Sequence, residues 1–299
     1  MLVQIEKKAA PRLPEFLRKP QAEYLAVTAL KRELRGLDLH TVCESARCPN
    51  LHECFSRGAA TFMILGNICT RGCGFCSVPK GDPRKKDFGL DADEPEHVAA
   101  QAERMKLRYV VLTSVNRDEL ADGGSEHWRL TVAAVRRRLP EAQVEVLTPD
   151  FNGDMEAVER VLSAGPHVYN HNMETVKRLY RKVRPQADYE QSLRVLRHAK
   201  EHAPEVLTKS GLMVGLGESH EEVRELLRDV RRDGQADVAT IGQYLQPTRR
   251  NLAVAKYVEP AEYEEWKAYG ESLGFKAVFA GPFVRSSYMA DLVAHEAQH

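Results

Sequence analysis

The stretch Cys69-Thr-Arg-Gly-Cys73-Gly-Phe-Cys76 places three cysteines at the spacing CxxxCxxC, directly after a short β-like run. Gly72 and Gly74 let a short loop wrap closely around a bound group, because glycine has no side chain that could clash. Three thiolates on a four-iron cube leave one iron without a protein ligand, and an open metal position can bind a substrate or cofactor. The stretch therefore predicts an iron–sulfur site with one open iron.

Two other metal-binding interpretations of this loop are weaker. A structural zinc site prefers four ligands with paired CxxC spacing, and the nearest histidine, His52, lies among the other cysteines rather than at such a spacing. A ferredoxin-type electron carrier supplies four cysteines per cluster and is usually a much shorter chain. Neither class accounts for three thiols in one loop of a long chain.

All six cysteines of the chain lie between Cys43 and Cys76. A disulfide framework would connect distant parts of a small secreted protein, whereas this chain crowds its thiols into one window, which favours metal ligation. The earlier triad, Cys43, Cys48 and Cys54, lacks any CxxC pair and is ambiguous when taken alone.

Composition excludes several partners. The chain has 299 residues, and its 43 Lys+Arg balance its 43 Asp+Glu, so its formal net charge is zero. A zero balance argues against nucleic acid as the main partner, because neutralising phosphates needs a surplus of cations. The N-terminus has no apolar signal region, and no run approaches the ~20 apolar residues that span a bilayer. We expect a cytoplasmic protein without a membrane partner.

After the cysteine window, β-like runs alternate with amphipathic helical patterns. The helical patterns include Trp128, Val132 and Val135, whose spacing puts apolar side chains on one helix face. The expected strands span residues 61–65, 109–113, 143–147, 167–169, 207–214 and 237–241, followed by a helix at 260–273 and a strand at 275–280. Repeated strand–helix–strand units imply a parallel sheet with right-handed crossovers. Six units are too few for an eight-unit barrel, so we predict an α/β fold: a partial, open (βα)6 TIM-like barrel with N- and C-terminal extensions.

Each expected strand ends in a polar or glycine-rich segment, such as SVNRDELADGG and NHNMET. Active sites of parallel α/β barrels are built from the loops at the carboxyl ends of the strands. The pattern is what an enzyme would show, although loops are polar in any barrel.

The CxxxCxxC loop after the first strand of a partial barrel resembles that of the radical S-adenosylmethionine (SAM) superfamily. The resemblance implies that the methionyl amine and carboxylate of SAM chelate the fourth iron, and that the reduced cluster cleaves the sulfonium to give a 5′-deoxyadenosyl radical. Beside such a loop, Cys43, Cys48 and Cys54 are interpreted as ligands of a second, auxiliary [4Fe–4S] cluster.

The wider chain resembles the lipoyl synthase family. The resemblance rests on CESARCPNLHECF, TSVNRDELADGG, NHNMETVKRLYRKVRP, KSGLMVGLGE, GQYLQPT and RSSY, which run in the family's order from Cys43 to Tyr288. CxxxCxxC alone indicates only the superfamily, whereas the first triad together with RSSY is far more discriminating. The chain departs from the family pattern after QYLQPT, where Asn251-Leu252 stands in place of a histidine before the leucine.

The resemblance divides the chain and assigns a further ligand. Residues 1–59 would form an N-terminal extension with the auxiliary-cluster cysteines, 60–245 the radical SAM partial barrel, and 246–299 a C-terminal extension with the RSSY motif. In this family a serine of that motif is the fourth ligand of the auxiliary cluster. We carry this role to Ser287, with Ser286 as the alternative, because spacing cannot choose between them.

The implied reaction is that of a sulfurtransferase in lipoate biosynthesis. Two sulfur atoms from the auxiliary cluster are inserted at C6 and C8 of an octanoyl chain that is amide-linked to a lysine of a carrier protein. The carrier would be an octanoylated lipoyl domain or the glycine-cleavage H protein. A reductant such as ferredoxin or flavodoxin is also implied.

SAM contacts are expected from polar side chains at the strand ends. Thr113, Ser114, Asn170 and Glu174 are the candidates for the methionine and ribose parts. Loop capping is an equally good role for Ser114 and Asn170. Lys209 could approach the cofactor carboxylate or a cluster, although a lone basic residue is more often a surface charge.

Three other functions were weighed. A radical SAM methylthiotransferase also has two clusters, but one that acts on RNA should add a nucleic-acid-binding module and a basic surface. Biotin synthase is a nearer mechanistic relative, yet its second cluster would not use this N-terminal triad. A metal-stabilised binding protein without catalysis is disfavoured by the strand-end loops.

Overall fold

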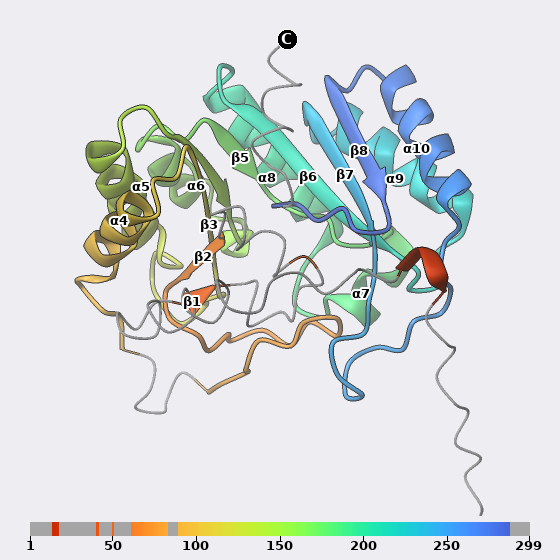
Figure 1. Ribbon diagram of the computed structural model, residues 1–299, viewed down its shortest axis with the longest axis horizontal. Helices are drawn as coiled ribbons and strands as arrows, with labels where there is room; N and C mark the ends of the chain where they lie inside the picture. Colours follow the sequence, from red (N-terminus) through yellow and green to blue (C-terminus); the bar gives the residue numbers. More distant parts are fainter. Residues whose placement is uncertain (1–13, 18–39, 42–49, 51–60, 83–88, 288–299) are drawn as a thin grey trace, which may run out of the picture.

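The computed structural model describes residues 14–17, 40–41, 50, 61–82 and 89–287. Its elements alternate strand and helix along the chain (Figure 1). The strands are β1 (His40–Thr41), β2 (Thr61–Ile64), β3 (Tyr109–Ser114), β4 (Gln143–Leu147), β5 (Val168–Asn170), β6 (Leu207–Val214), β7 (Val238–Gln243) and β8 (Ala277–Gly281). The α-helices are α4 (Glu94–Arg104), α5 (Ser125–Arg138), α6 (Met155–Leu162), α7 (Tyr180–Val183), α8 (Tyr189–His202), α9 (His220–Arg232) and α10 (Pro260–Ser272). Short 3-10 helices are η1 (Glu15–Leu17), η3 (Phe151–Gly153) and η4 (Lys177–Leu179).

The eight strands among the described residues form one sheet, in the order in which they occur in the chain. Strands β2 to β8 are parallel, and β1 pairs antiparallel with β2 at one edge. The prediction of a partial, open barrel is confirmed. The strand expected at 275–280 becomes β8, which continues the sheet beside β7, so the sheet extends beyond the six predicted strands on that side.

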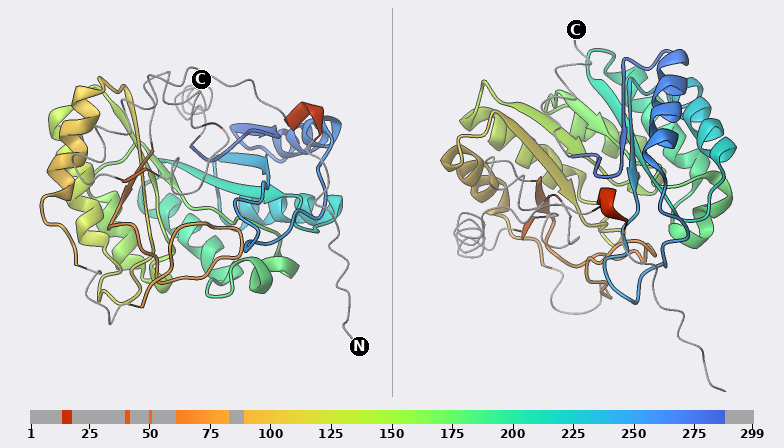
Figure 2. Two further views of the ribbon diagram at one scale, coloured as in Figure 1. Left: turned by 60° about the horizontal axis from the view of Figure 1, so that its bottom comes forward. Right: turned by 45° about the vertical axis from the view of Figure 1, so that its right-hand side comes forward.

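The helices lie along the outside of the curved sheet (Figures 1 and 2), where α4 packs on α5, α5 on α6, α6 on α8, and α9 on α10. Helix α9 shows why this face is buried: Val223, Leu226 and Val230 recur at helical spacing and are 3% exposed or less. Its start is fixed by a capping box, in which the side chains of Ser219 and Glu222 each bond the other's backbone N–H. No described helix combines the length and the apolar character that crossing a bilayer requires.

A largely buried polar cluster connects β3, β4, β5 and β6, from Tyr109 at the start of β3 to Asn170 at the end of β5. We call it the floor cluster, and it consists of Tyr109, Glu145, Asn170 and Lys209. Lys209 Nζ lies 2.9 and 3.0 Å from the two carboxylate oxygens of Glu145. The Tyr109 hydroxyl (2.8 Å) and the Asn170 amide (3.0 Å) donate to the same carboxylate. Lys209 is therefore neither a surface charge nor free to reach a cofactor, because its ammonium is committed to a buried carboxylate.

Candidate iron–sulfur site

The loop that carries Cys69, Cys73 and Cys76 follows β2 at the carboxyl edge of the sheet. The loop closes on itself, because the Cys69 backbone N–H donates to Pro79 O (2.8 Å) and Cys69 O accepts from the Gly81 N–H (3.1 Å). All three cysteines are free and half-buried. The fold therefore holds three thiols at the mouth of the barrel, where barrel enzymes place their chemistry.

Burial opposes the ionisation of two of the three thiols, those of Cys73 and Cys76. Burial raises the pKa of Cys73, with Arg184 acting in the opposite direction. Burial raises the pKa of Cys76 to about 12, the Val78 backbone N–H opposes this, and the neighbouring Cys73 and Cys69 add to it. Cys69 Sγ accepts from the backbone N–H groups of Arg71 and Asn116, each at 3.4 Å. Clustered thiols with N–H donors aimed at sulfur fit a [4Fe–4S] cluster, whose iron ions would stabilise the thiolates.

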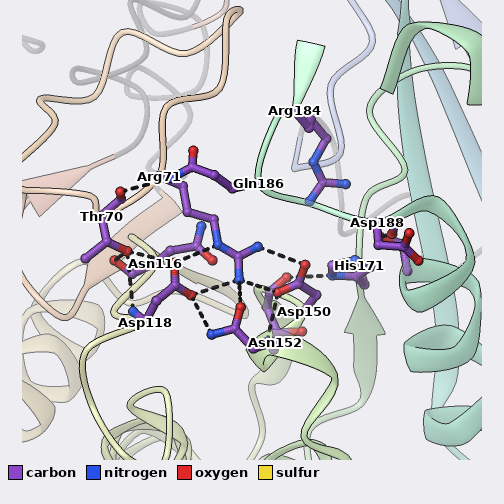
Figure 3. Close-up of polar contacts among 12 residues, drawn as sticks. Thr70, Arg71, Asn116, Asp118, Asp150, Asn152, His171, Arg184, Gln186 and Asp188 are labelled. Atoms are coloured by element: carbon purple, nitrogen blue, oxygen red, sulfur yellow. Dashed lines mark hydrogen bonds and ion pairs between the residues drawn. The ribbon is translucent and has the colours of Figure 1, made fainter. Parts of the chain in front are cut away.

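Arg71, inside the cysteine loop, ties this loop to the segments after β3 and β4 (Figure 3). Its guanidinium contacts both carboxylate oxygens of Asp118 at 2.8 Å, and it contacts the Asp150 carboxylate at 2.8 and 2.7 Å. Arg71 Nη2, which also contacts Asp118, donates to Asn152 Oδ1 at 2.6 Å. Burial alone would raise the pKa of Asp150, but Arg71 outweighs that effect and lowers it to about 2. We call Arg71, Asp118, Asp150 and Asn152 the arginine clamp.

A second contact holds the other end of the same loop. The Asn251 side chain donates to Cys76 O (2.9 Å) and Gly74 O (3.3 Å), and the Leu252 N–H also donates to Gly74 O (3.0 Å). A Cβ added at Gly74 would lie 2.9 Å from Leu252 side-chain carbons, so glycine is required there by close approach. At Gly72 an added Cβ would meet only ordinary contacts, the nearest atom being 3.5 Å away.

Some of the residues expected to contact SAM already use their polar atoms in hydrogen bonds within the protein, and others do not. Thr113 Oγ1 donates to Leu147 O (3.0 Å), so its hydroxyl is used within the sheet. In the part of the chain that the structure describes, Ser114 Oγ and Asn170 Oδ1 are buried without a hydrogen-bond partner. Unpaired buried polar atoms are rare in folded proteins and indicate a missing ligand or water. Ser114 and Asn170 therefore fit a polar group bound at the mouth, and their role stays a prediction.

Glu174 and His171 extend this polar mouth beyond β5. Burial raises the pKa of Glu174, while Arg184 and a hydrogen bond from the Asn172 amide (3.0 Å) act against that rise. Burial, followed by Arg184, lowers the pKa of His171 to about 4, so its ring is neutral at physiological pH. His171 Nδ1 lies 3.0 Å from Thr148 O, and Nε2 has no partner among the described residues.

The predicted auxiliary-cluster cysteines, Cys43, Cys48 and Cys54, lie outside the described residues. One residue between them is described: Asn50 is fully buried and donates from Nδ2 to Phe283 O at 2.8 Å. This contact places Asn50 beside Phe283, two residues before the RSSY motif begins.

The two serines of the motif differ in their contacts. Ser286 donates to Asn172 Oδ1 (2.9 Å), which also accepts from the Gly211 N–H (3.0 Å). Ser286 is thus engaged with the barrel mouth, which leaves Ser287 as the better candidate for a cluster ligand. That assignment stays a prediction.

Sequence reasoning did not identify the arginine clamp or Asn251. Arg71 stood inside the quoted cysteine motif, and its presence there was the available signal. Asn251 stood at the one departure from the family pattern and was given no chemical role. Their partners are far away in the sequence, 47 and 79 residues for Arg71 and 175 for Asn251, so no local pattern could reveal them.

Comparisons with known proteins agree with this geometry. The chain matches the family model of the radical SAM superfamily over residues 63–230, and that of the N-terminal domain of lipoyl synthase of the radical SAM family over residues 2–48. It is 53% identical to lipoyl synthase of Thermus thermophilus over 95% of this chain and 87% of the relative. It is 55% identical to lipoyl synthase of Rubrobacter xylanophilus (87% and 80%) and 50% identical to lipoyl synthase of Escherichia coli (98% and 90%).

Solved structures share the fold at low sequence identity. HydG, a maturase of the [FeFe]-hydrogenase, superposes with a TM-score of 0.56 at 13% identity, over 78% of this chain and 54% of that chain. Streptococcus suis SuiB bound to S-adenosylmethionine superposes with a TM-score of 0.53 at 13% identity, over 83% and 58%. At this identity the likeness concerns the fold alone.

Proposed function

The chain belongs to the lipoyl synthase family of the radical SAM superfamily, and from that premise we propose that its two cysteine triads hold two [4Fe–4S] clusters with different roles. The enzyme inserts two sulfur atoms at C6 and C8 of a protein-bound octanoyl-lysine. The observation that carries this function is identity of about half over nearly the whole length of curated lipoyl synthases.

The proposed ligand sets follow the two triads. Cys69, Cys73 and Cys76 would hold the cluster that binds SAM, and Cys43, Cys48, Cys54 and Ser287 the auxiliary cluster. With SAM bound, the first cluster supplies a hydrogen-abstracting radical, and the auxiliary cluster supplies the sulfur. The proximity of Asn50 to Phe283 supports a site shared by both chain ends.

The chain's own side chains supply orientation. The arginine clamp and Asn251 hold the cysteine loop from two sides, which fixes the thiols relative to the barrel mouth. Ser114, Asn170 and Glu174 would orient the polar parts of SAM, while Thr113 contributes through the sheet. Burial lowers the pKa of His171 to about 4, so its ring adds no positive charge to the mouth of the barrel at neutral pH.

The domain division follows the same roles: 1–59 with the auxiliary triad, 60–245 as the radical SAM barrel, and 246–299 with the RSSY motif. The last segment also contributes α10 and β8 to the barrel wall. The substrate is an octanoylated protein. We propose a lipoyl domain or a glycine-cleavage H protein as the carrier, ferredoxin or flavodoxin as the reductant, and the cytoplasm as the compartment.

The test separates the two triads. Anaerobically reconstituted protein should hold about eight irons per chain. Cys69→Ala should abolish SAM cleavage, whereas Cys43→Ala should keep some cleavage and give no lipoyl product, as measured by 5′-deoxyadenosine and by mass spectrometry of an octanoyl-lysine peptide. If both variants lost only sulfur insertion, the division of roles would be wrong.

A further inference from the structure

Two adjacent helices on the outer layer present three metal-ligating side chains to one another. Glu159 comes from α6, and His198 and His202 come from α8. The two histidines are four residues apart, so they lie on the same face of their helix. We propose that Glu159, His198 and His202 form a second kind of metal site, which binds one divalent transition cation such as Zn²⁺.

The separations of the ligand atoms match those around a small tetrahedral cation. His198 Nε2 lies 3.0 Å from Glu159 Oε1, and His202 Nδ1 lies 3.6 Å from the same oxygen. Zn–N and Zn–O bonds of 2.0–2.2 Å in a tetrahedron put neighbouring ligand atoms about 3.3 Å apart. One ligand atom from each of the three residues lies within 4.8 Å of the others. The cation therefore fits with only small side-chain adjustments.

The orientation of the two histidine rings also supports a shared metal site. The His198 and His202 rings are near-parallel, with an interplanar angle of 26° and centroids 6.0 Å apart. Each ring directs a nitrogen toward the same carboxylate oxygen. All three side chains are between 29% and 41% exposed, so a water molecule can complete the coordination and the ion can enter from solvent.

Two imidazoles and a carboxylate define the class of ion. This donor set suits Zn²⁺, Ni²⁺ or Cu²⁺, whereas Mg²⁺ and Ca²⁺ prefer oxygen ligands alone. The site also lies apart from the cysteine loop. His202 ends α8 just before β6 begins, at the amino edge of the sheet, while the cysteines lie at the carboxyl edge. A bound ion would link α6 to α8 on the outside of the barrel.

The experiment uses the full-length protein with its iron–sulfur clusters in place, under anaerobic conditions. The protein is dialysed against buffered Zn²⁺, and zinc and iron are counted together by mass spectrometry. The wild type should take up one zinc per chain with no loss of iron. His198→Asn and His202→Asn should each weaken zinc binding by more than about tenfold, since each removes one of three ligands.

His97→Asn is the matched control. His97 is an exposed histidine on α4 whose Nδ1 lies 3.8 Å from Asp91, so it offers a histidine–carboxylate pair without a second histidine. This variant should bind zinc as the wild type does. Anomalous diffraction at the zinc edge should place the peak between α6 and α8. Unchanged zinc uptake in His198→Asn, or a peak at any other position, would overturn the proposal.

Discussion

The floor cluster and the mouth of the barrel both contain buried polar groups, but within the described part of the chain these groups are paired at the floor and partly unpaired at the mouth. At the floor, Lys209 and Glu145 pair with each other, and Tyr109 and Asn170 complete the carboxylate's hydrogen bonds. At the mouth, Ser114 and Asn170 keep polar atoms that no described residue bonds, and Cys73 and Cys69 oppose the ionisation of Cys76. The hydrogen bonds of the floor are made within the protein, whereas polar atoms at the mouth stay unpaired among the described residues. Asn170 takes part in both, with its amide nitrogen bonded below and its oxygen unpaired.

The largest effect is expected at the floor. Lys209→Met leaves the Glu145 carboxylate buried without its cation and should lower the free energy of unfolding by about 3–5 kcal/mol. Denaturant unfolding measures this loss. The double variant Lys209→Met/Glu145→Gln should recover much of it. Lys177→Met, at an exposed pair with Glu190, should leave the free energy of unfolding nearly unchanged, because exposed ion pairs contribute little. Equal losses in the two lysine variants would contradict the distinction.

At the mouth, Arg71→Gln removes the arginine clamp and frees the cysteine loop from Asp118 and Asp150. Misplacement of the loop by about 1 Å should slow SAM cleavage by roughly 10²-fold, because the reacting groups lose their alignment. The measurement is 5′-deoxyadenosine formation normalised to bound iron. Arg71→Lys keeps the positive charge but not the paired hydrogen-bond geometry. Its rate of SAM cleavage should fall between those of the wild type and Arg71→Gln. A normal rate in Arg71→Gln would show that the clamp does not position the loop.

The mouth should also make the free energy of unfolding depend on pH between about 6.5 and 4. The pKa of His171 is lowered from 6.5 to about 4 in the folded protein, so the unfolded chain binds a proton first. The contribution of the neutral His171 ring to the free energy of unfolding is complete above pH 6.5 and is lost as the pH falls toward 4. At pH 5 the loss is about 2 kcal/mol. Urea midpoints at pH 7 and 5 measure this difference. His171→Gln should reduce it, while a variant of exposed His97 should not.

The smallest effect is expected at Asn251. Asn251→Ala removes two hydrogen bonds to Gly74 O and Cys76 O, each worth about 1 kcal/mol. The cluster should then lose iron to a chelator several-fold faster, as followed by absorbance. Asn251→His, which restores the family pattern and a ring N–H donor, should recover most of the difference. Identical iron loss in the wild type and Asn251→Ala would remove any role for this contact.

The sequence by itself determined the chemistry of the site and the order of the fold. Three thiols at CxxxCxxC predict cluster ligands because the motif is local. The alternation of strands with amphipathic helices predicts a parallel sheet, because periodicity indicates which face of each element is buried. Only the tertiary structure decided which charges pair. Lys209 meets Glu145 across 64 residues, and Asn251 meets Cys76 across 175. Such pairs depend on strand register and loop packing, which bring distant residues together and leave no periodic trace in the sequence.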